Sequence, residues 1–403
     1  MARLLYLVHR LPYPPNKGDK VRSFHLLKHL SRDHEVHLGT FVDDPDDEQY
    51  VENVRSYCAS LHVERLSPRF AKLRSLSGFV SGEALSLPYY RNLGMQAWVM
   101  DTLKRHTFDA AVVFSSVMAQ YVPDSLPSLV DFVDADSAKW TAYADSHAWP
   151  MSWVYRREGR RLLDFERHTA ARALRSFFVT PAEAALFTRL APECDARVEA
   201  IGNGVDSDFF SPQHGGASPY AADELPLVFT GAMDYWPNID AACWFATEVL
   251  PELRRLEPRL RFHVVGRSPA PSVLALAGEG VAVSGTVPDV RPWLAHAAAV
   301  VAPLRIARGV QNKILEAMAM GRPVVAADAC TGAIEAESGR DLLAAETADD
   351  YIAAIRRLLD DAVLAAEIGR NGRQCVLRQY SWDAHLSGID RYLPQATTRT
   401  AQA

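Results

Sequence analysis

Short apolar runs alternate with amphipathic stretches along the whole chain. The runs predicted to form strands cover residues 4–8, 35–41, 110–114, 129–133, 176–180, 197–201, 227–231, 261–266, 281–285, 299–303 and 323–327. Residues 21–30 have helical spacing, with Phe24, Leu27 and Leu30 on one face, and residues 155–175 form a long basic helix. Strands that alternate with helices in this way predict βαβ units and parallel sheets.

The pattern is interrupted once, by residues 206–225, which are rich in Ser, Pro, Gly and acidic residues. We interpret this stretch as a linker between a first domain, 1–205, and a second domain, 226–380. A helix over 381–394 is expected to cross back to the first domain, and 395–403 should be a disordered tail. The predicted fold class is α/β, with two Rossmann-like domains that face a central cleft. Ligands of such sheets bind beyond the carboxyl ends of the strands.

Composition narrows the class of protein. The chain has 403 residues and is 48% hydrophobic, enough for two cores. Its net charge of −6 argues against a nucleic-acid partner. Residues 1–200 hold 25 basic and 25 acidic residues, so the remainder carries the negative charge, and the first half is better suited to approach an anionic membrane.

The cysteines and the hydropathy of the chain indicate the cellular compartment in which the protein is expected. The five cysteines are scattered without a Cys-x-x-Cys pair, which fits reduced thiols. The apolar run 4–8 is too short for a signal peptide, and no run approaches the roughly 18 residues of a membrane span. We expect a cytoplasmic protein, soluble or peripheral on the inner face of the cell membrane.

The most informative segment is 309–325, GVQNKILEAMAMGRPVV. Gly309 lets the backbone approach a ligand, and the helix that follows opens with unpaired N–H groups that suit a phosphate. Lys313 and Glu316 are three residues apart and share a helical face. Gly321 ends the helix before a strand begins. An ordinary helix–strand joint would show the same spacing.

The amino-acid sequence of this segment, together with those of several others, resembles a known family of enzymes. LEAMAMGRPVV (315–325) resembles the donor site of retaining glycosyltransferases of the family 4 type, which have the GT-B fold. IGNGVDSDFFSP (201–212), LVFTGAMDYWPNIDA (227–241) and VSGTVPDVRPWLAHAAAVVAPL (283–304) resemble other segments of that family. The opening, 4–30, resembles a branch tied to exosortase (PEP-CTERM) exopolysaccharide systems. The resemblance implies sugar transfer from a nucleoside-diphosphate sugar to a glycan or lipid-linked glycan, with retention of configuration.

The resemblance also assigns roles. Glu316 stands where the family binds the ribose, and a carboxylate can accept hydrogen bonds from both vicinal hydroxyls. Eight residues earlier the family has another glutamate, which contacts the sugar; this chain has Arg308. The turn 231–238, GAMDYWPN, also lacks the basic pair that the family often has there. We therefore predict that Arg308 and Lys313 supply the positive charge for the diphosphate.

The loop before the first helix takes the place of the family's glycine-rich loop. Gly18 permits close approach of the backbone to a ligand, and Asp19 and Arg22 are candidate acceptor or phosphate contacts. The candidate catalytic residues are Asp19, Arg308 and Lys313. The donor-binding candidates are Gly18, Gly231, Gly266, Arg308, Gly309, Val310, Lys313 and Glu316.

Two patterns suggest metal but have simpler explanations. Asp134-Ala135-Asp136 matches the D-x-D signature of the other large glycosyltransferase fold and could bind Mg²⁺ or Mn²⁺. Because the rest resembles GT-B, which usually needs no metal, we interpret Asp134 and Asp136 as acceptor-side residues. His25 and His29 are an i, i+4 pair with no third ligand indicated. We expect no metal and no cofactor.

Other interpretations stay open at this point. The segment 153–175 has seven arginines against three acids, together with Trp153 and Tyr155, and suits either a membrane surface or a solvated helix with internal ion pairs. A nucleotide-sugar epimerase can share the GT-B architecture. A non-catalytic sugar-nucleotide-binding protein would explain the missing first glutamate.

Overall fold

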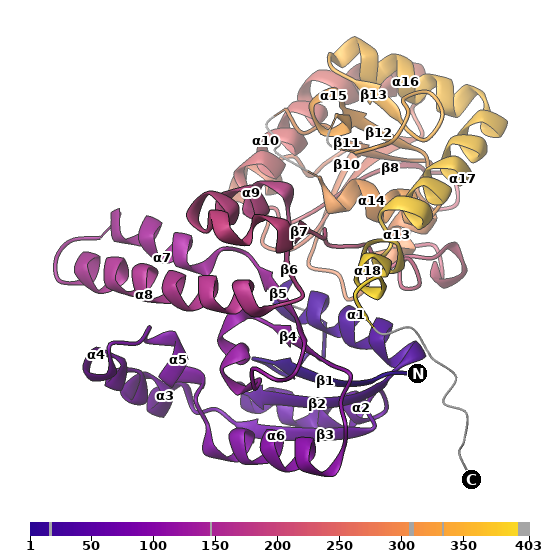
Figure 1. The fold of residues 1–403 in the computed structure, drawn as a ribbon. Helices are drawn as coiled ribbons and strands as arrows, with labels where there is room; N and C mark the ends of the chain where they lie inside the picture. Colours follow the sequence, from indigo (N-terminus) through magenta and orange to yellow (C-terminus); the bar gives the residue numbers. More distant parts are fainter. Residues whose placement is uncertain (16–17, 146, 306–309, 333, 394–403) are drawn as a thin grey trace, which may run out of the picture. The chain divides into compact units, whose positions relative to one another are not determined.

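The computed structural model describes residues 1–15, 18–145, 147–305, 310–332 and 334–393. The chain divides into two compact units (Figure 1). Unit 1 contains Met1–Asn203 and the residues from Leu386 onward, and unit 2 contains Gly204–His385. Each unit is a parallel sheet with helices packed around it and a hydrophobic core of its own.

Unit 1 is built on a seven-stranded sheet with the order β3-β2-β1-β4-β5-β6-β7. Neighbouring strands are parallel throughout. The strands are β1 (Arg3–Val8), β2 (Glu35–Val42), β3 (Ser60–Arg65), β4 (Ala110–Phe114), β5 (Ser128–Val133), β6 (Arg175–Phe178) and β7 (Val198–Ala200). The central strand β4 is buried along its whole length and β1 from Leu4 onward, as expected for strands covered on both faces.

The helices of unit 1 fall in the crossovers between these strands. They are α1 (Gly18–Asp33), α2 (Val51–Arg55), α3 (Pro68–Ser75), α4 (Ser77–Ser81), α5 (Ser86–Tyr90), α6 (Leu93–Arg105), α7 (Asp136–Asp145), α8 (Met151–Arg172) and α9 (Pro181–Leu190). Long insertions precede β4 and β6, so this unit carries the helical layers α3–α5 and α7–α8 in addition to the basic βαβ plan.

Unit 2 repeats the plan with six parallel strands in the order β10-β9-β8-β11-β12-β13. The strands are β8 (Leu225–Thr230), β9 (Leu260–Val265), β10 (Val281–Gly285), β11 (Ala299–Ala302), β12 (Val324–Ala327) and β13 (Leu343–Ala345). The helices are α10 (Trp236–Trp244), α11 (Leu250–Leu256), α12 (Pro271–Leu274), α13 (Arg291–Ala295), α14 (Asn312–Ala319), α15 (Asp328–Thr331), α16 (Ala348–Asp360) and α17 (Ala362–Gln379), followed by α18 (Trp382–Asp390), in which the division between the units falls.

Each strand order has one point where the direction of winding reverses. In unit 1 this point lies between β1 and β4, and in unit 2 between β8 and β11. At such a point, the loops that follow the two strands diverge and leave a crevice at the carboxyl edge of the sheet, where ligands of this class of fold bind. In unit 2, the turn after β8 and residues 310 and 311, directly before α14, lie at this crevice.

The predicted strands are confirmed with small shifts at their ends, and β4 and β10 match residue for residue. Two strands, β3 and β13, were not predicted. In the acidic run 43–48, Asp47 is buried, and its carboxylate accepts from the Lys20 ammonium at 2.5 Å. Both side chains are buried, so each charge is compensated by its partner and not by water.

Within the described residues, none of the helices combines the length and the apolar character that crossing a bilayer would require.

Candidate functional site

A cavity of about 620 Å³ opens at the carboxyl edge of the unit 2 sheet, at the reversal point between β8 and β11. Its volume is within the usual range of small-molecule sites. Five of the predicted donor-binding residues line it together: Gly231, Gly266, Val310, Lys313 and Glu316. Of the other donor-site candidates, Gly18 begins α1 in unit 1, and Arg308 and Gly309 lie outside the described residues.

Gly231 and Gly266 directly follow β8 and β9 and lie in close contact. A Cβ atom on Gly266 would lie 1.6 Å from the carbonyl oxygen of Gly231, which no side chain can do without displacing the backbone. A Cβ atom on Gly231 would lie 2.9 Å from the ammonium nitrogen of Lys313. The two glycines therefore let two strand ends and a lysine converge at the floor of the cavity.

Lys313 extends from the first turn of α14 toward the turn that follows β8. Its Nζ donates to Oδ1 of Asn238 at 2.5 Å and lies 4.3 Å from the centre of the Phe229 ring. Burial lowers the pKa of Lys313 to about 8, and Glu316 partly opposes this shift. Among the described residues, no carboxylate lies within ion-pair distance of this ammonium, so its charge is available to an anionic ligand.

Glu316 lies one turn further along α14 on the same side. The side chain is half-buried, and within the described part of the chain its carboxyl group makes no hydrogen bond. Burial raises the pKa of Glu316 to about 7, and Lys313 partly opposes this shift. A carboxylate that is removed from water without hydrogen-bond partners costs free energy. A ligand whose hydroxyl groups donate to it can recover that free energy.

Arg267 is a cavity residue that the sequence analysis missed. It directly follows Gly266 at the end of β9, is exposed, and has no carboxylate partner among the residues that the structure describes. The signal that could have found it is its position, because residues just after a strand of a parallel sheet face the ligand edge. Among its described lining residues, the cavity thus carries two cations, Lys313 and Arg267, although the turn after β8 has none.

Asp19 lies in the first turn of α1, in a network at the carboxyl end of β1. Its Oδ2 is 2.8 Å from a guanidinium nitrogen of Arg10 and 3.6 Å from Nε2 of His9. Hydrogen bonding to His9, with the charge of Arg10, holds the pKa of Asp19 well below its usual range against the effect of burial. Arg10 also pairs with Asp43 at 2.7 Å. Asp19 is therefore ionised and held in place.

Arg22 has a different environment from the one expected. It is 1% exposed, and its Nε donates to Asp131 at 2.7 Å while Nη1 donates to Asn203 Oδ1 at 3.0 Å and to the Gly202 carbonyl at 3.2 Å. An enclosed guanidinium with these partners ties α1 and β5 to the end of unit 1. Contact with an acceptor or a phosphate would require it to leave them.

Asp134 and Asp136 follow β5 and share one cation. The Lys139 ammonium lies 2.6 Å from Asp134 and 3.2 Å from Asp136, and burial raises the pKa of Asp136. A metal ion would have to displace this ammonium. In the described ranges, no cluster of three or more His, Cys, Asp or Glu side chains has the arrangement of a metal site. Of the i, i+4 histidine pair, His29 is hydrogen-bonded through Nε2 to Oδ1 of Asp390 at 2.8 Å.

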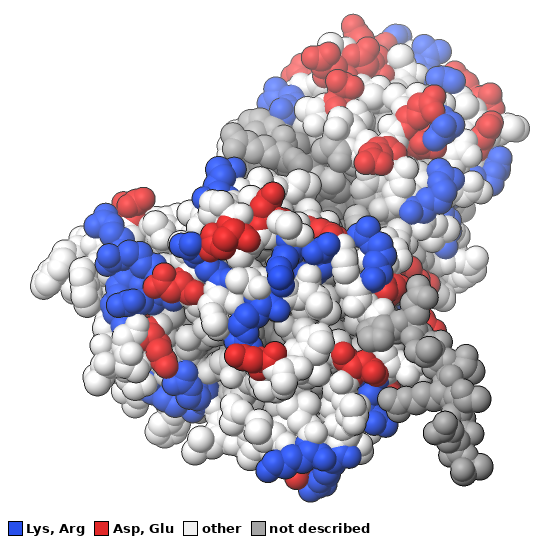
Figure 2. Space-filling view, viewed as in Figure 1, with Lys and Arg blue, Asp and Glu red and all other residues white. Residues whose placement is uncertain are grey.

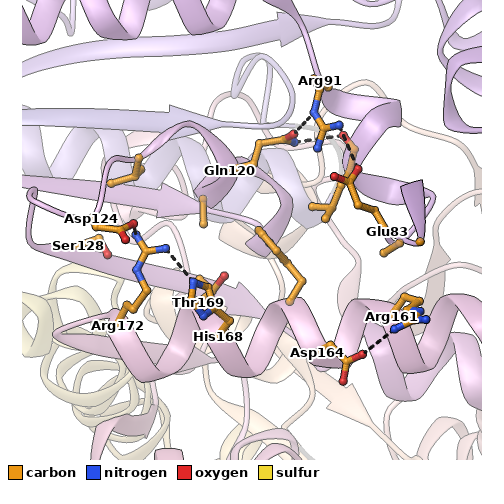
Figure 3. A pocket seen from close by; sticks show the side chains of 16 residues that line it. Glu83, Arg91, Gln120, Asp124, Ser128, Arg161, Asp164, His168, Thr169 and Arg172 are labelled. Carbon is orange, nitrogen blue, oxygen red and sulfur yellow. Dashed lines mark hydrogen bonds and ion pairs between the residues drawn. The ribbon is translucent and has the colours of Figure 1, made fainter. Parts of the chain in front are cut away.

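A second cavity, of about 500 Å³, lies in unit 1 between α5 and α8 (Figure 3). Its three arginines each have an acidic neighbour in the lining: Arg91 with Glu83, Arg161 with Asp164, and Arg172 with Asp124. Arg172 also contacts His168 at 3.1 Å. Because these cations are neutralised within the cavity, the unit 2 cavity is the better candidate for an anionic ligand.

Comparison with known proteins agrees with this choice. Residues 224–361 match the family model described as Glycosyl transferases group 1, a range that contains the whole described lining of the unit 2 cavity. The protein is a glycosyltransferase. No curated protein sequence matches the chain.

Solved structures resemble the chain over its full length. HepE of Anabaena, in complex with UDP, is 16% identical, with 97% of this chain and 99% of that chain covered and a TM-score of 0.57. Sucrose-phosphate synthase of Thermosynechococcus elongatus is 16% identical, with coverage of 97% and 98% and a TM-score of 0.58. A glycosyltransferase of Rickettsia africae is 12% identical, with coverage of 97% for both chains and a TM-score of 0.59. These likenesses show the fold, which is GT-B with two Rossmann-like domains.

Proposed function

We propose that the glycosyltransferase takes a nucleoside-diphosphate sugar as donor in the unit 2 cavity. The observation that carries the proposal is the pairing of Lys313 and Glu316 on one helix, facing a floor of two glycines. The ammonium suits the diphosphate, the carboxylate suits the ribose hydroxyls, and the glycines admit the ligand close to the backbone. Further support is that HepE structures with this fold hold UDP and UDP-glucose.

The proposed reaction is transfer with retention, of the family 4 type, to a glycan or lipid-linked glycan in exopolysaccharide biosynthesis. The leaving diphosphate would accept the proton of the attacking hydroxyl on the same face of the sugar. Glu316 is the one carboxylate among the described lining residues of the cavity. This supports a route without a protein carboxylate as nucleophile, because a double displacement would need a second acid in the site.

We also propose that transfer needs no metal and takes place in the cytoplasm, at the inner face of the membrane. The Lys139 ammonium already pairs with both Asp134 and Asp136, in the place where a metal ion would lie. Activity that persists in EDTA would agree with this. Complete loss in EDTA with recovery on addition of Mn²⁺ would overturn it and return the D-x-D segment to the site.

The decisive experiment is a donor panel followed by a substitution. Release of nucleoside diphosphate is measured for UDP-, GDP-, ADP- and dTDP-sugars, with and without lipid-linked glycans. Calorimetry then compares the selected diphosphate on wild type and on Glu316→Ala, which should weaken binding by about 1–3 kcal/mol because the ribose hydroxyls lose their acceptor. Glu248→Ala, on an exposed glutamate of the same unit, is the matched control.

The outcomes separate the alternatives. Unchanged affinity in a folded Glu316→Ala variant removes Glu316 from the site and the proposal with it. Binding without hydrolysis or transfer for any donor would identify a non-catalytic sugar-nucleotide-binding protein. A donor converted to its epimer without an acceptor, detected by NMR of the product, would identify an epimerase. NMR of the new anomeric proton decides retention.

A further inference from the structure

In two short helices of unit 1, the large apolar side chains face solvent, whereas those of an ordinary surface helix face the core. In α3 and α4, the buried residues are the small Ala71 and Gly78. The large apolar residues instead face solvent: Phe70 is 73% exposed, Leu73 66%, Leu76 54% and Val80 93%. They follow at intervals of three or four residues and so form one stripe. A helix of a globular domain normally packs such a stripe onto the core.

Phe79, the neighbour of Val80 in the sequence, connects α4 to the start of α8. Phe79 of α4 stacks on Trp153 with ring centres 6.0 Å apart. The Arg157 guanidinium lies 4.9 Å over Phe79 and donates to the carbonyls of Gly78 and Glu83. Trp153 is itself 50% exposed, and two further apolar residues just before it in the sequence are exposed as well: Trp149 is 80% exposed and Met151 43%. These contacts join residues 67–82 to residues 147–161, and we call the exposed side chains of the two segments the α4–α8 surface.

The α4–α8 surface is also strongly basic. Its two segments contain seven Arg and Lys residues against one acid, Glu158. That acid is buried and accepts from the backbone N–H groups of Leu85 and Ser86, so its charge is used inside the unit. Arg69, Lys72 and Arg160 are exposed and have no acidic partner among the described residues. Figure 2 shows blue side chains gathered over this end of unit 1, at the left edge of the view.

We propose that the α4–α8 surface docks onto an anionic lipid membrane. Exposed apolar side chains with tryptophans suit the boundary between headgroups and acyl chains, and the unpaired cations suit anionic headgroups. A second copy of the chain would bring an equally basic surface and be repelled. This inference names the surface that would hold the enzyme at the membrane. It rests on the proposed function only for the reason why the enzyme approaches lipid.

Flotation of the full chain with extruded vesicles tests the surface. Vesicles of phosphatidylcholine with roughly one third phosphatidylglycerol should carry the wild type, and phosphatidylcholine alone should carry much less. Leu73→Ser combined with Val80→Ser should lower the partition coefficient at least about tenfold. The matched control is Leu274→Ser with Val363→Ser in unit 2, where the side chains are 51% and 75% exposed. It should bind like wild type.

The charge contribution is tested separately. Arg69→Gln with Lys72→Gln and Arg160→Gln should abolish the preference for phosphatidylglycerol, and high salt should do the same to wild type. Arg356→Gln with Arg357→Gln and Arg370→Gln, three exposed residues of unit 2, is the control of equal charge change.

Two results would overturn the proposal. One is equal flotation of wild type and the Leu73/Val80 variant. The other is a concentration-dependent dimer in sedimentation velocity that the same variant abolishes, which would assign the surface to self-association. Hydrolysis of the donor in the absence of lipid should be unchanged in all these variants. Loss of vesicle binding therefore leaves the proposed transfer intact, and a protein that binds vesicles without transferring sugar would refute the function alone.

Discussion

The Lys313 ammonium of α14 lies 2.5 Å from the side-chain oxygen of Asn238, at the start of α10. The same amide group of Asn238 donates to the carbonyl oxygen of Ala232 at 2.9 Å. One buried asparagine thus holds the turn after β8 and receives a cation from another helix. A turn that contains no basic residue therefore has an ammonium group directly beside it.

We predict that Asn238→Asp weakens binding of the nucleoside diphosphate by about tenfold or more. The new carboxylate would pair with Lys313, so the diphosphate would meet a neutralised cation and a nearby negative charge. Calorimetry on wild type, Asn238→Asp and Lys313→Ala measures this. The two variants should lose similar affinity. An Asn238→Asp variant that binds as tightly as wild type would show that Lys313 does not contact the diphosphate.

Nucleotide affinity should have a maximum between about pH 7 and pH 8. The pKa of Glu316 is raised to about 7 by burial, so its ribose-binding carboxylate is lost as the pH falls below that value. The pKa of Lys313 is lowered to about 8 by burial, so its ammonium is lost as the pH rises above that value. Each limb should approach a tenfold loss of affinity per pH unit.

The two limbs of this profile can be assigned with variants. Glu316→Gln should remove the acidic limb and Lys313→Ala the alkaline limb, each with weaker binding overall. Titration in buffers of different ionisation enthalpy should show proton uptake on binding above pH 8, because the diphosphate stabilises the charged lysine. A flat profile between pH 6 and pH 9 would mean that neither group contacts the nucleotide.

Glu166 should make unit 1 lose stability as the pH rises. Its side chain is fully buried in α8, and its Oε1 and Oε2 accept from the N–H and hydroxyl groups of Ser137. Burial raises the pKa of Glu166 to about 8. The folded state therefore holds a proton that the unfolded chain releases near its ordinary pKa, so stability falls between about pH 4.5 and pH 8.

Replacement of Glu166 by Gln removes this titration and keeps an oxygen acceptor for Ser137. Glu166→Gln should be more stable than wild type at pH 9, by roughly 1–3 kcal/mol, and about equal at pH 5. Urea unfolding at the two pH values measures the difference. Unfolding curves of wild type and variant that differ by the same amount at both pH values would show that Glu166 has an ordinary pKa in the folded protein.

Most strands could be predicted from the sequence because they are buried on both faces and form continuous apolar runs, as in β4. The strand β3, SLHVER, is an edge strand whose residues are only partly buried, so it has no such run. The strand β13 has three residues, too few to show a period. Neighbours in the sheet specify these two strands, and local sequence does not.

The site was predictable where local spacing determines it and not where packing does. Lys313 and Glu316 share a helix, so their position three residues apart already places them on one face. The burial of Arg22 depends on Asp131 and Asn203, which are distant in sequence, and nothing near residue 22 indicates it. Likewise, the spacing of Phe70, Leu73 and Val80 is that of an ordinary core-facing helix, and only the structure shows that these residues face solvent.

The last prediction concerns Arg308, which lies outside the described residues and stands where the family 4 pattern has a glutamate. We proposed from the sequence that it binds the diphosphate together with Lys313. Charge that develops on the leaving group should strengthen such a contact in the transition state. Arg308→Ala should therefore lower kcat by about 10²–10³-fold, the size typical of removing one oriented donor. Arg267→Ala tests whether the exposed arginine that lines the cavity contributes as well.

Arg308→Glu is the informative companion variant. It restores the acid of the family pattern but introduces a negative charge beside the phosphates, so its kcat should be lower than that of Arg308→Ala. Steady-state kinetics with the donor from the panel compares the two. If Arg308→Glu equals or exceeds wild type, position 308 contacts the sugar, and Lys313 and Arg267 must supply the positive charge without it. A glutamate variant that fails while Arg308→Ala loses little would instead show that the site tolerates no acid at 308, with Arg308 itself dispensable.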